Sequence, residues 1–257
     1  MSSGMPLRIY LTGRLAIEHE RALLDQEEFP GRQGVVLFAR LLVNRGSAVS
    51  REELTDVLWS DAPPKAWDAA LNAIVSKLRV LLARAGLKKS EVLQAALGCY
   101  QLNLPGDAWV DVEAAADSMH RADGFIKADR YRDAWAAAQV AYHICRRPFL
   151  PGESGAWVDQ TRERFATLFV RASECLAETY IRNGEPAIAV DLSTQAIVAQ
   201  PYRETGYQLL MRAHEASGNR AEALLAYERC RKLLSDELGV FPSAETQAVY
   251  QKLLQHR

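Results

Sequence analysis

Two helices joined by a short break constrain the fold of this chain more than any other segment. Ser50 and Glu53 stand three residues apart, the spacing of a capping box at a helix start. That helix is predicted to end near Trp59, because Pro63-Pro64 forbids its continuation. A second, longer helix is predicted over 66–86, where a glycine supplies the stop. The pattern is typical of a helix-turn-helix.

The longer helix has two chemically different faces at ~100° per residue. Its apolar side chains gather on one face, which is predicted to be core: Leu71, Ile74, Val75, Leu78, Leu81 and Leu82. The opposite face carries a row of three polar side chains, Asn72, Ser76 and Arg79, and the residues that flank this row are Ala73, Lys77, Val80 and Arg84. Such a row offers an amide to adenine, a guanidinium to guanine and a methyl group to thymine, whereas Lys77 and Arg84 are better placed to neutralise phosphates. The alternative is that this is only the solvated face of an amphipathic helix.

Short strands are predicted on both sides of the two helices. Residues 7–17 alternate in polarity around Thr12-Gly13, which indicates two strands of a small sheet, and a first helix is predicted from Val35 to Asn44. Residues 92–102 are predicted to form a strand, a tight turn at Gly98 and a second strand. A hairpin in this place predicts a winged helix over residues 1–105.

Two further residues of this region complete the candidate DNA-binding set. Arg51 lies in the capped helix and Tyr100 in the hairpin. Packing and DNA contact stay equally open for Tyr100, whereas packing is favoured for Trp59.

Charge and length are consistent with two domains of which one is locally basic. The chain has 257 residues and a net charge of -1, which by itself argues against a nucleic-acid binder. The basic residues are nevertheless concentrated: residues 65–89 contain one acidic residue, Asp68, and six basic ones, namely Lys65, Lys77, Arg79, Arg84, Lys88 and Lys89. The sequence therefore predicts a basic surface confined to this segment.

The second half, residues 106–257, is predicted to be an all-α domain that begins after Pro105-Gly106-Asp107. Tyr180, Gly184, Ala189, Ala196 and Pro201 are followed 34 residues later by His214, Gly218, Ala223, Cys230 and Ser235. Thirty-four residues is the period of the tetratricopeptide helix pair, and residues 129–141 indicate a degenerate third copy. One stacked array is predicted from about Val110 onward. The expected fold is mainly α with a small β component.

Several function classes find no support in the sequence. The four cysteines are far apart, which favours buried thiols over a metal site or a disulfide framework. No phosphate loop, nucleophile elbow or metal-binding His pair is present, so we expect neither an enzyme nor a cofactor. The sequence contains no apolar run long enough to span a membrane and no secretion signal, so a cytoplasmic location is expected.

These segments resemble the SARP family of bacterial regulators, in which a response-regulator type of winged helix precedes a bacterial transcriptional activator domain. The resemblance rests on Val49-Ser50-Arg51-Glu52-Glu53-Leu54, Leu58-Trp59-Ser60-Asp61, Val75-Ser76-Lys77-Leu78-Arg79, Pro201-Tyr202-Arg203-Glu204, Ala223 to Tyr227, and Glu237-Leu238-Gly239-Val240-Phe241-Pro242-Ser243-Ala244-Glu245-Thr246. Recognition helices of the family are often richer in arginine than this one.

The resemblance implies a transcriptional activator, with double-stranded promoter DNA and RNA polymerase holoenzyme as partners. It implies binding to direct repeats, two or more subunits side by side on DNA, and genes of secondary metabolism. It also implies that the loop over residues 60–65 faces polymerase. The alternative is a protein-interaction module whose winged helix no longer binds DNA, and the salt dependence of DNA affinity separates the two.

Overall fold

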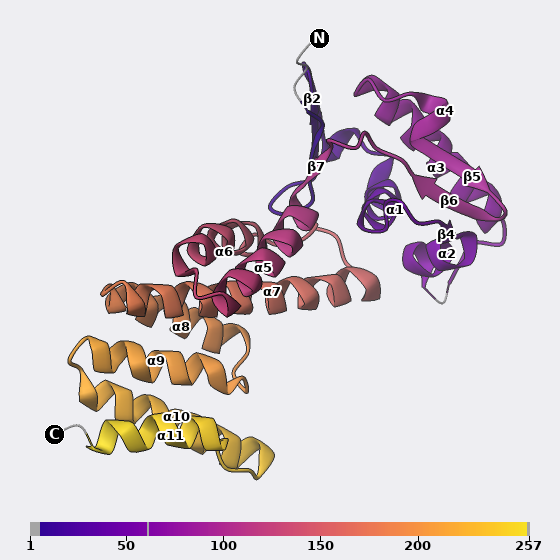
Figure 1. The fold of residues 1–257 in the computed structure, drawn as a ribbon. Helices are drawn as coiled ribbons and strands as arrows, with labels where there is room; N and C mark the ends of the chain where they lie inside the picture. Colours follow the sequence, from indigo (N-terminus) through magenta and orange to yellow (C-terminus); the bar gives the residue numbers. More distant parts are fainter. Residues whose placement is uncertain (1–5, 61, 256–257) are drawn as a thin grey trace. The chain divides into compact units, whose positions relative to one another are not determined.

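The computed structural model describes residues 6–60 and 62–255, and these form two compact units (Figure 1). The first unit comprises the chain up to Ala114 together with Arg147–Arg164. The second comprises Ala115–Arg146 and the chain from Phe165 onward. The fold is mainly α with small sheets, as predicted.

A four-stranded sheet opens the first unit, in the order β3-β2-β1-β7. Its strands are β1 (Arg8–Tyr10), β2 (Ala16–His19), β3 (Ala22–Asp25) and β7 (Trp109–Val110). The predicted pair corresponds to β1 and β2, which run antiparallel, and β7 adds to β1 in parallel. The sequence did not indicate β3, which has only four residues. Glu20, two residues before this strand, has a positive φ of 52° in the turn between β2 and β3. The short 3-10 helix η1 (Gln26–Glu28) follows it.

The first unit contains, ahead of the wing, the helices α1 (Gly31–Val43), α2 (Arg51–Trp59) and α3 (Trp67–Arg84). The capping box at the start of α2 is present, because the Ser50 hydroxyl accepts from the Glu53 amide at 3.1 Å and the Glu53 carboxylate accepts from the Ser50 amide at 3.1 Å. All six apolar residues that the sequence placed on the inner face of α3 are buried. A short helix, α4 (Lys89–Val92), occupies residues that the sequence did not assign to a helix.

The wing follows α4 as a hairpin. Strands β5 (Leu93–Ala96) and β6 (Cys99–Leu102) pair antiparallel, and β4 (Val49–Ser50) joins the free edge of β6. The two residues between β5 and β6 are Leu97 and Gly98, with φ of 51° and 73°. Positive φ at both central positions is the geometry of a two-residue hairpin turn, and glycine adopts it without steric cost. The predicted winged helix is thus confirmed as a fold.

The buried carboxylate of Asp111 links the start of α5 (Asp111–Lys127) to residues that follow β1. Asp111 accepts hydrogen bonds from the amides of Leu11 and Thr12 and from the Thr12 hydroxyl, at 2.8 to 3.0 Å. Burial raises the pKa of this carboxyl above its usual value, although these hydrogen bonds act in the opposite direction. The contacts tie residues beyond the predicted boundary at 105/106 to the first sheet.

Seven helices follow in the order α5 (Asp111–Lys127), α6 (Tyr131–Cys145), α7 (Ala156–Arg182), α8 (Pro186–Ala199), α9 (Glu204–Ala216), α10 (Arg220–Leu238) and α11 (Ala244–Gln255). Figure 1 shows α8, α9 and α10 layered one after another. Gly184 and Gly218, which are 34 residues apart, both turn the chain between helices at φ of 78° and 71°. Ala189 and Ala223, also 34 residues apart, are fully buried at helix contacts. The tetratricopeptide-like array is confirmed.

The array is less continuous than predicted. Arg147–Arg164 packs with the first unit. Each unit is therefore built from two separate stretches of the chain, and no single boundary in the sequence divides them. For example, the Leu150 amide donates to the Leu11 carbonyl at 2.9 Å. A boundary between independently folding domains at 105/106 stays a prediction.

Three simple features complete the description. Cys145, Cys175 and Cys230 are buried, as expected, but Cys99 is only half-buried. Within residues 6–60 and 62–255, no group of His, Cys, Asp and Glu side chains could hold a metal ion. No helix in the same part of the chain is both long and apolar enough to cross a bilayer.

Candidate nucleic-acid interface

The outer face of α3 carries exposed side chains that have no partner. Ala73, Ser76 and Lys77 are exposed, and neither Ser76 nor Lys77 makes a side-chain hydrogen bond or ion pair to another described residue. Val80 lies one turn further on and is 49% exposed, although it is a large apolar residue. Because α3 buries its opposite face in the core, this row is held rigidly and is open to a ligand.

A hydrogen-bonded network surrounds Asn72 at the beginning of the same face. The Tyr100 hydroxyl donates to Asn72 Oδ1 at 2.7 Å, and Arg51 donates to the Tyr100 hydroxyl at 2.9 Å and to Asn72 Oδ1 at 3.3 Å. Asn72 Nδ2 donates to Asp68 at 3.3 Å, and Arg51 pairs with the other oxygen of Asp68. The network therefore joins α2, α3 and the wing strand β6 at one point.

This network limits what its members can do directly. Reading adenine needs both the oxygen and the amide nitrogen of Asn72, and both are engaged. The Arg51 guanidinium lies 5.3 Å from the centre of the Tyr100 ring, which is itself 2% exposed. The Tyr100 ring is thus buried, which favours the packing alternative for this residue, and contact of Tyr100 with DNA stays a prediction. The Tyr100 hydroxyl positions Asn72.

Arg79 points toward the wing. Its Nε and Nη2 donate to the Leu93 carbonyl at 3.0 and 2.8 Å, so the guanidinium is half-buried beside β5 and not part of a fully open row. It lines a groove of about 890 Å³ with Lys88, Lys89, Ser90 and Gln94 among its walls. Three basic side chains in one groove between α3 and the wing make a site suited to an anionic ligand.

Arg84 and Lys88 each form an ion pair with a carboxylate of the first unit. Arg84 pairs with Glu28, which comes from η1, although 57% of its side chain remains exposed. Lys88 pairs with Glu91 at 3.2 Å, and both side chains are well exposed. Exposed pairs of this kind contribute little and are readily exchanged.

The loop between α2 and α3 is exposed. Ser60 has a φ of 49°, the amide of Trp67 donates to the Pro64 carbonyl at 2.9 Å, and Lys65 extends to solvent. Asp61, which belongs to the same predicted loop, lies outside the described residues. Trp59 is half-buried, in keeping with a packing role.

Sequence reasoning missed some members of this surface. Asp68 orients both Arg51 and Asn72, and its spacing of four residues from Asn72 on a helix was the available signal. Ser90 and Gln94 line the basic groove, but their place depends on α4 and β5, and the sequence did not indicate that turn of helix.

Comparison with known proteins agrees with the fold. The family of the bacterial transcriptional activator domain matches residues 110–254. The chain is 32% identical over 234 residues to the transcriptional regulatory protein EmbR of Mycobacterium tuberculosis, covering 88% of this chain and 58% of EmbR. It is 31% identical over 219 residues to the regulatory protein AfsR of Streptomyces coelicolor, covering 85% of this chain and 22% of AfsR.

A further relative and a solved structure extend the comparison. The transcriptional regulator RedD of Streptomyces coelicolor is 31% identical over 216 residues, covering 81% of this chain and 60% of RedD. The structure of Mycobacterium tuberculosis EmbR in complex with a low-affinity phosphopeptide has a TM-score of 0.88 at 25% identity, covering 98% of this chain and 65% of that one. The chain thus spans about a fifth of AfsR and less than two thirds of EmbR and RedD.

Proposed function

The chain belongs to the SARP family of transcriptional regulators, which carry the bacterial transcriptional activator domain, and from this membership we propose that it activates transcription by binding promoter DNA sequence-specifically. The observation that carries the proposal is the outer face of α3, where Ser76 and Lys77 are exposed without partners beside a groove with three basic side chains. That combination provides both base-reading and phosphate-binding groups.

Each member of the face has a proposed role. Ser76 donates to or accepts from a base edge, and Ala73 contacts a thymine methyl group. Lys77 neutralises a phosphate, and Arg84 does the same by exchanging Glu28 for DNA. Arg79 binds a base or a phosphate from the groove beside the wing. Its Nε and Nη2 already donate to the Leu93 carbonyl, so Nη1 is the group that donates to DNA.

Arg51, Asn72 and Tyr100 act as one unit in this proposal. Tyr100 positions Asn72, and Arg51 carries charge at the N-terminal end of α3. Asn72 contacts a base when the Arg51 guanidinium moves from this network to a DNA phosphate. Asn72 Oδ1 then loses one of its two donors and keeps only the Tyr100 hydroxyl.

We also propose the partners that the family implies. The chain binds direct repeats as two or more subunits, and it recruits RNA polymerase holoenzyme through the loop after α2 and through the helical array. The regulated genes are those of secondary metabolism, and such a regulator works in the bacterial cytoplasm as a binding protein rather than an enzyme. This choice of gene class follows from the family resemblance alone.

Genome-wide mapping of the bound protein tests the proposal. We expect its sites to lie upstream of promoters and to contain a repeated motif in direct orientation, at a spacing that is close to a whole number of helical turns. Sites scattered without a shared motif would contradict sequence-specific binding. Engaged side chains at Asn72, Arg79 and Arg84 favour the alternative, an interaction module that does not bind DNA, and purified protein that fails to retain duplex DNA at low salt would establish it.

A further inference from the structure

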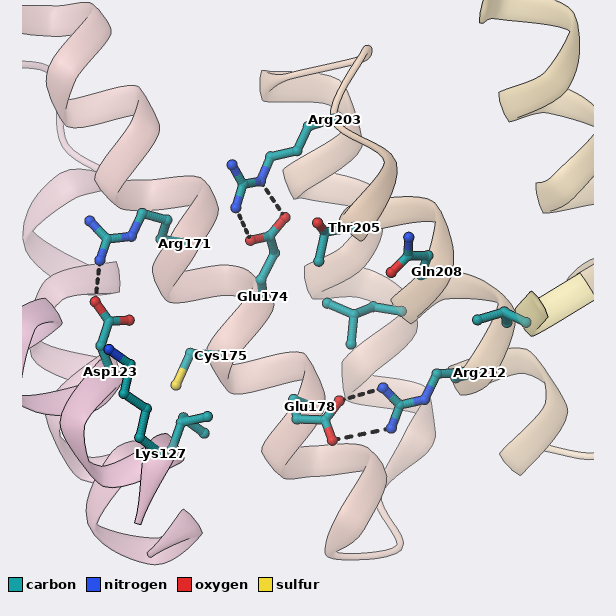
Figure 2. A pocket seen from close by; sticks show the side chains of 13 residues that line it. Asp123, Lys127, Arg171, Glu174, Cys175, Glu178, Arg203, Thr205, Gln208 and Arg212 are labelled. Atoms are coloured by element: carbon teal, nitrogen blue, oxygen red, sulfur yellow. Dashed lines mark hydrogen bonds and ion pairs between the residues drawn. The ribbon is translucent and has the colours of Figure 1, made fainter. Parts of the chain in front are cut away.

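The second unit contains a charged cleft that the proposed DNA-binding role does not use. Figure 2 shows its side chains converging from α5, α7 and α9, and Val249 of α11 completes the lining. The cleft has a volume of about 460 Å³. A concave surface across stacked helix pairs is where repeat arrays bind ligands.

Arginine–carboxylate pairs organise this cleft. Arg203 donates to both oxygens of Glu174 at 2.7 and 2.9 Å, and Arg212 donates to both oxygens of Glu178 at 2.6 and 3.1 Å (Figure 2). Arg171 of α7 pairs with Asp123 of α5 through a single contact between Nη2 and Oδ2. Bidentate pairs fix the planes of the guanidinium groups.

In the two bidentate pairs the arginine is more exposed to solvent than the glutamate, whereas Arg171 and Asp123 are equally exposed, at 38% each. The side chains of Glu174 and Glu178 are 10% and 18% exposed, whereas those of Arg203 and Arg212 are 40% and 38% exposed. Burial would raise the pKa of Glu178, but hydrogen bonds from Arg212 and Arg182 outweigh it and hold the pKa below the usual value. The two glutamates are thus largely shielded from solvent, and the accessible charged side chains of the cleft are Asp123 and four cations, namely Lys127, Arg171, Arg203 and Arg212, so positive charge is in excess.

Unused donors remain on this cationic rim. Arg203 binds Glu174 through Nε and Nη2, which leaves Nη1, and Arg212 uses both of its Nη atoms, which leaves Nε. Lys127 is exposed, lines the cleft and makes no ion pair with any described residue. An anion can therefore bind without breaking the pairs that hold the helices together.

Besides the polar Thr205 and Gln208, apolar side chains line the cleft. Leu209, Val249 and Ile126 line the cleft together with Cys175. Burial raises the pKa of the Cys175 thiol to about 12, so this side chain is uncharged near neutral pH. A ligand that fits both features carries carboxylates at its ends and an apolar group between them.

The distance between the two arginines favours a peptide over a small dicarboxylate as the ligand of the cleft. Arg203 is the N-cap residue of α9 and Arg212 lies nine residues further on within it, so their Cα atoms are about 13 Å apart at 1.5 Å per residue. Two residues separated by four positions in an extended peptide also lie about 13 Å apart, and the residue midway between them points to the same side. A five-carbon dicarboxylate is too short to reach both.

We propose that this cleft binds an extended acidic peptide segment, with acidic residues at positions i and i+4 on Arg203 and Arg212 and an apolar residue at i+2 against Leu209 and Val249. Lys127 adds a third contact at the edge of the cleft. The proposal is independent of DNA binding, because every residue that lines the cleft belongs to the second unit.

Calorimetric titration of the full chain with the capped peptide Glu-Ser-Leu-Ser-Glu tests the proposal. We expect saturable binding at concentrations up to about 1 mM, and roughly tenfold weaker binding for Gln-Ser-Leu-Ser-Gln and for Glu-Ser-Ser-Ser-Glu. The double variant Glu174→Gln/Arg203→Gln, which replaces the ion pair with an amide pair, should lose affinity by about the same factor.

Two further variants keep the result interpretable. Glu228→Gln/Arg231→Gln removes an exposed pair of α10 that does not line the cleft, and it should bind the peptide as the unaltered protein does. If the first double variant unfolds, Lys127→Gln replaces it, because this side chain has no structural partner among the described residues and should still weaken binding several-fold.

Three outcomes would overturn the proposal. Glutarate that binds as tightly as the peptide and competes with it would assign the cleft to a small dicarboxylate. Equal affinity for the glutamate and glutamine peptides would remove the role of the arginines. Absence of saturable binding up to about 1 mM would leave no peptide site at all.

Discussion

At the scale of single residues, the main finding is that one buried hydroxyl organises a surface. Tyr100 is 2% exposed, yet its hydroxyl receives a hydrogen bond from Arg51 and gives one to Asn72. A buried polar group without a partner costs more than an ordinary hydrogen bond contributes. Tyr100 therefore contributes to the proposed interface through its hydrogen bonds with Arg51 and Asn72.

Replacement of Tyr100 by phenylalanine isolates this hydroxyl. Tyr100→Phe should lower the free energy of unfolding by about 1 kcal/mol, because Asn72 Oδ1 and Arg51 Nη1 each lose a partner. Urea unfolding followed by circular dichroism measures the loss. Tyr10→Phe is the matched control, since its hydroxyl makes a single hydrogen bond to Glu18 at a half-buried site. Equal stability of Tyr100→Phe and the unaltered protein would contradict the role assigned to the network.

The positions of individual side chains were also the least predictable from sequence. Helical spacing placed Arg79 in the outer row of α3, but the carbonyl of Leu93, fourteen residues away on the wing, directs its guanidinium. Arg84 meets Glu28 across fifty-six residues of sequence. No local pattern contains such a partner, because it depends on how separate elements pack.

At the scale of elements, local chemistry was sufficient where it was strong. The Ser50–Glu53 box and the Pro63-Pro64 break predicted α2 and the start of α3 to within a residue or two, because caps and prolines act on neighbouring backbone. Strand β3 and helix α4 have four residues each and were not predicted. Elements this short take their stability from tertiary contacts rather than from their own residues.

Removal of the Ser50 hydroxyl tests the cap of α2. Ser50→Ala should lower the free energy of unfolding by about 1 kcal/mol, because the Glu53 amide loses its acceptor. Chemical denaturation provides the measurement. Ser90→Ala changes an exposed serine without a side-chain hydrogen bond in the described structure and should leave stability within about 0.5 kcal/mol of the unaltered value. Identical losses in the two variants would mean that the cap contributes nothing specific.

At the scale of the whole molecule, the repeat in the sequence predicted the array, but it could not predict how the chain is shared between the units. The 34-residue offset fixed the helix pairs around Gly184 and Gly218. Arg147–Arg164 nevertheless belongs to the first unit, through contacts such as the hydrogen bonds from the Gly13 amide to the Pro148 carbonyl and from the Leu150 amide to the Leu11 carbonyl, both at 2.9 Å. Such contacts lie outside the repeat and leave no periodic trace.

The free energy of unfolding should depend on pH through Glu178, a carboxylate of the helical array. The pKa of Glu178 is lowered in the folded state, so this carboxylate contributes stability above its unfolded pKa of about 4.5, and the contribution is lost as the pH falls through the folded value. Glu178→Gln should therefore be less stable than the unaltered protein at pH 7, and the difference should shrink below about pH 4.5. Urea unfolding at several pH values measures both.

A matched substitution separates this effect from a general loss of charge. Glu237 is exposed on α10 and has no hydrogen bond or ion pair to another described residue, so Glu237→Gln should change neither the stability at pH 7 nor its dependence on pH. A stability difference between Glu178→Gln and the unaltered protein that stays constant from neutral to acid pH would refute the ion-pair account.

The central claim is that the outer face of α3 lies against DNA, and the salt dependence of DNA affinity tests it most directly. Affinity for a mapped operator, measured by fluorescence anisotropy between about 50 and 200 mM salt, should fall linearly on a log–log plot. Lys77→Ala should make the slope shallower by about one, whereas Lys232→Ala, an exposed lysine of α10, should leave it unchanged. A slope near zero for the unaltered protein, or the same slope for Lys77→Ala, would contradict the claim.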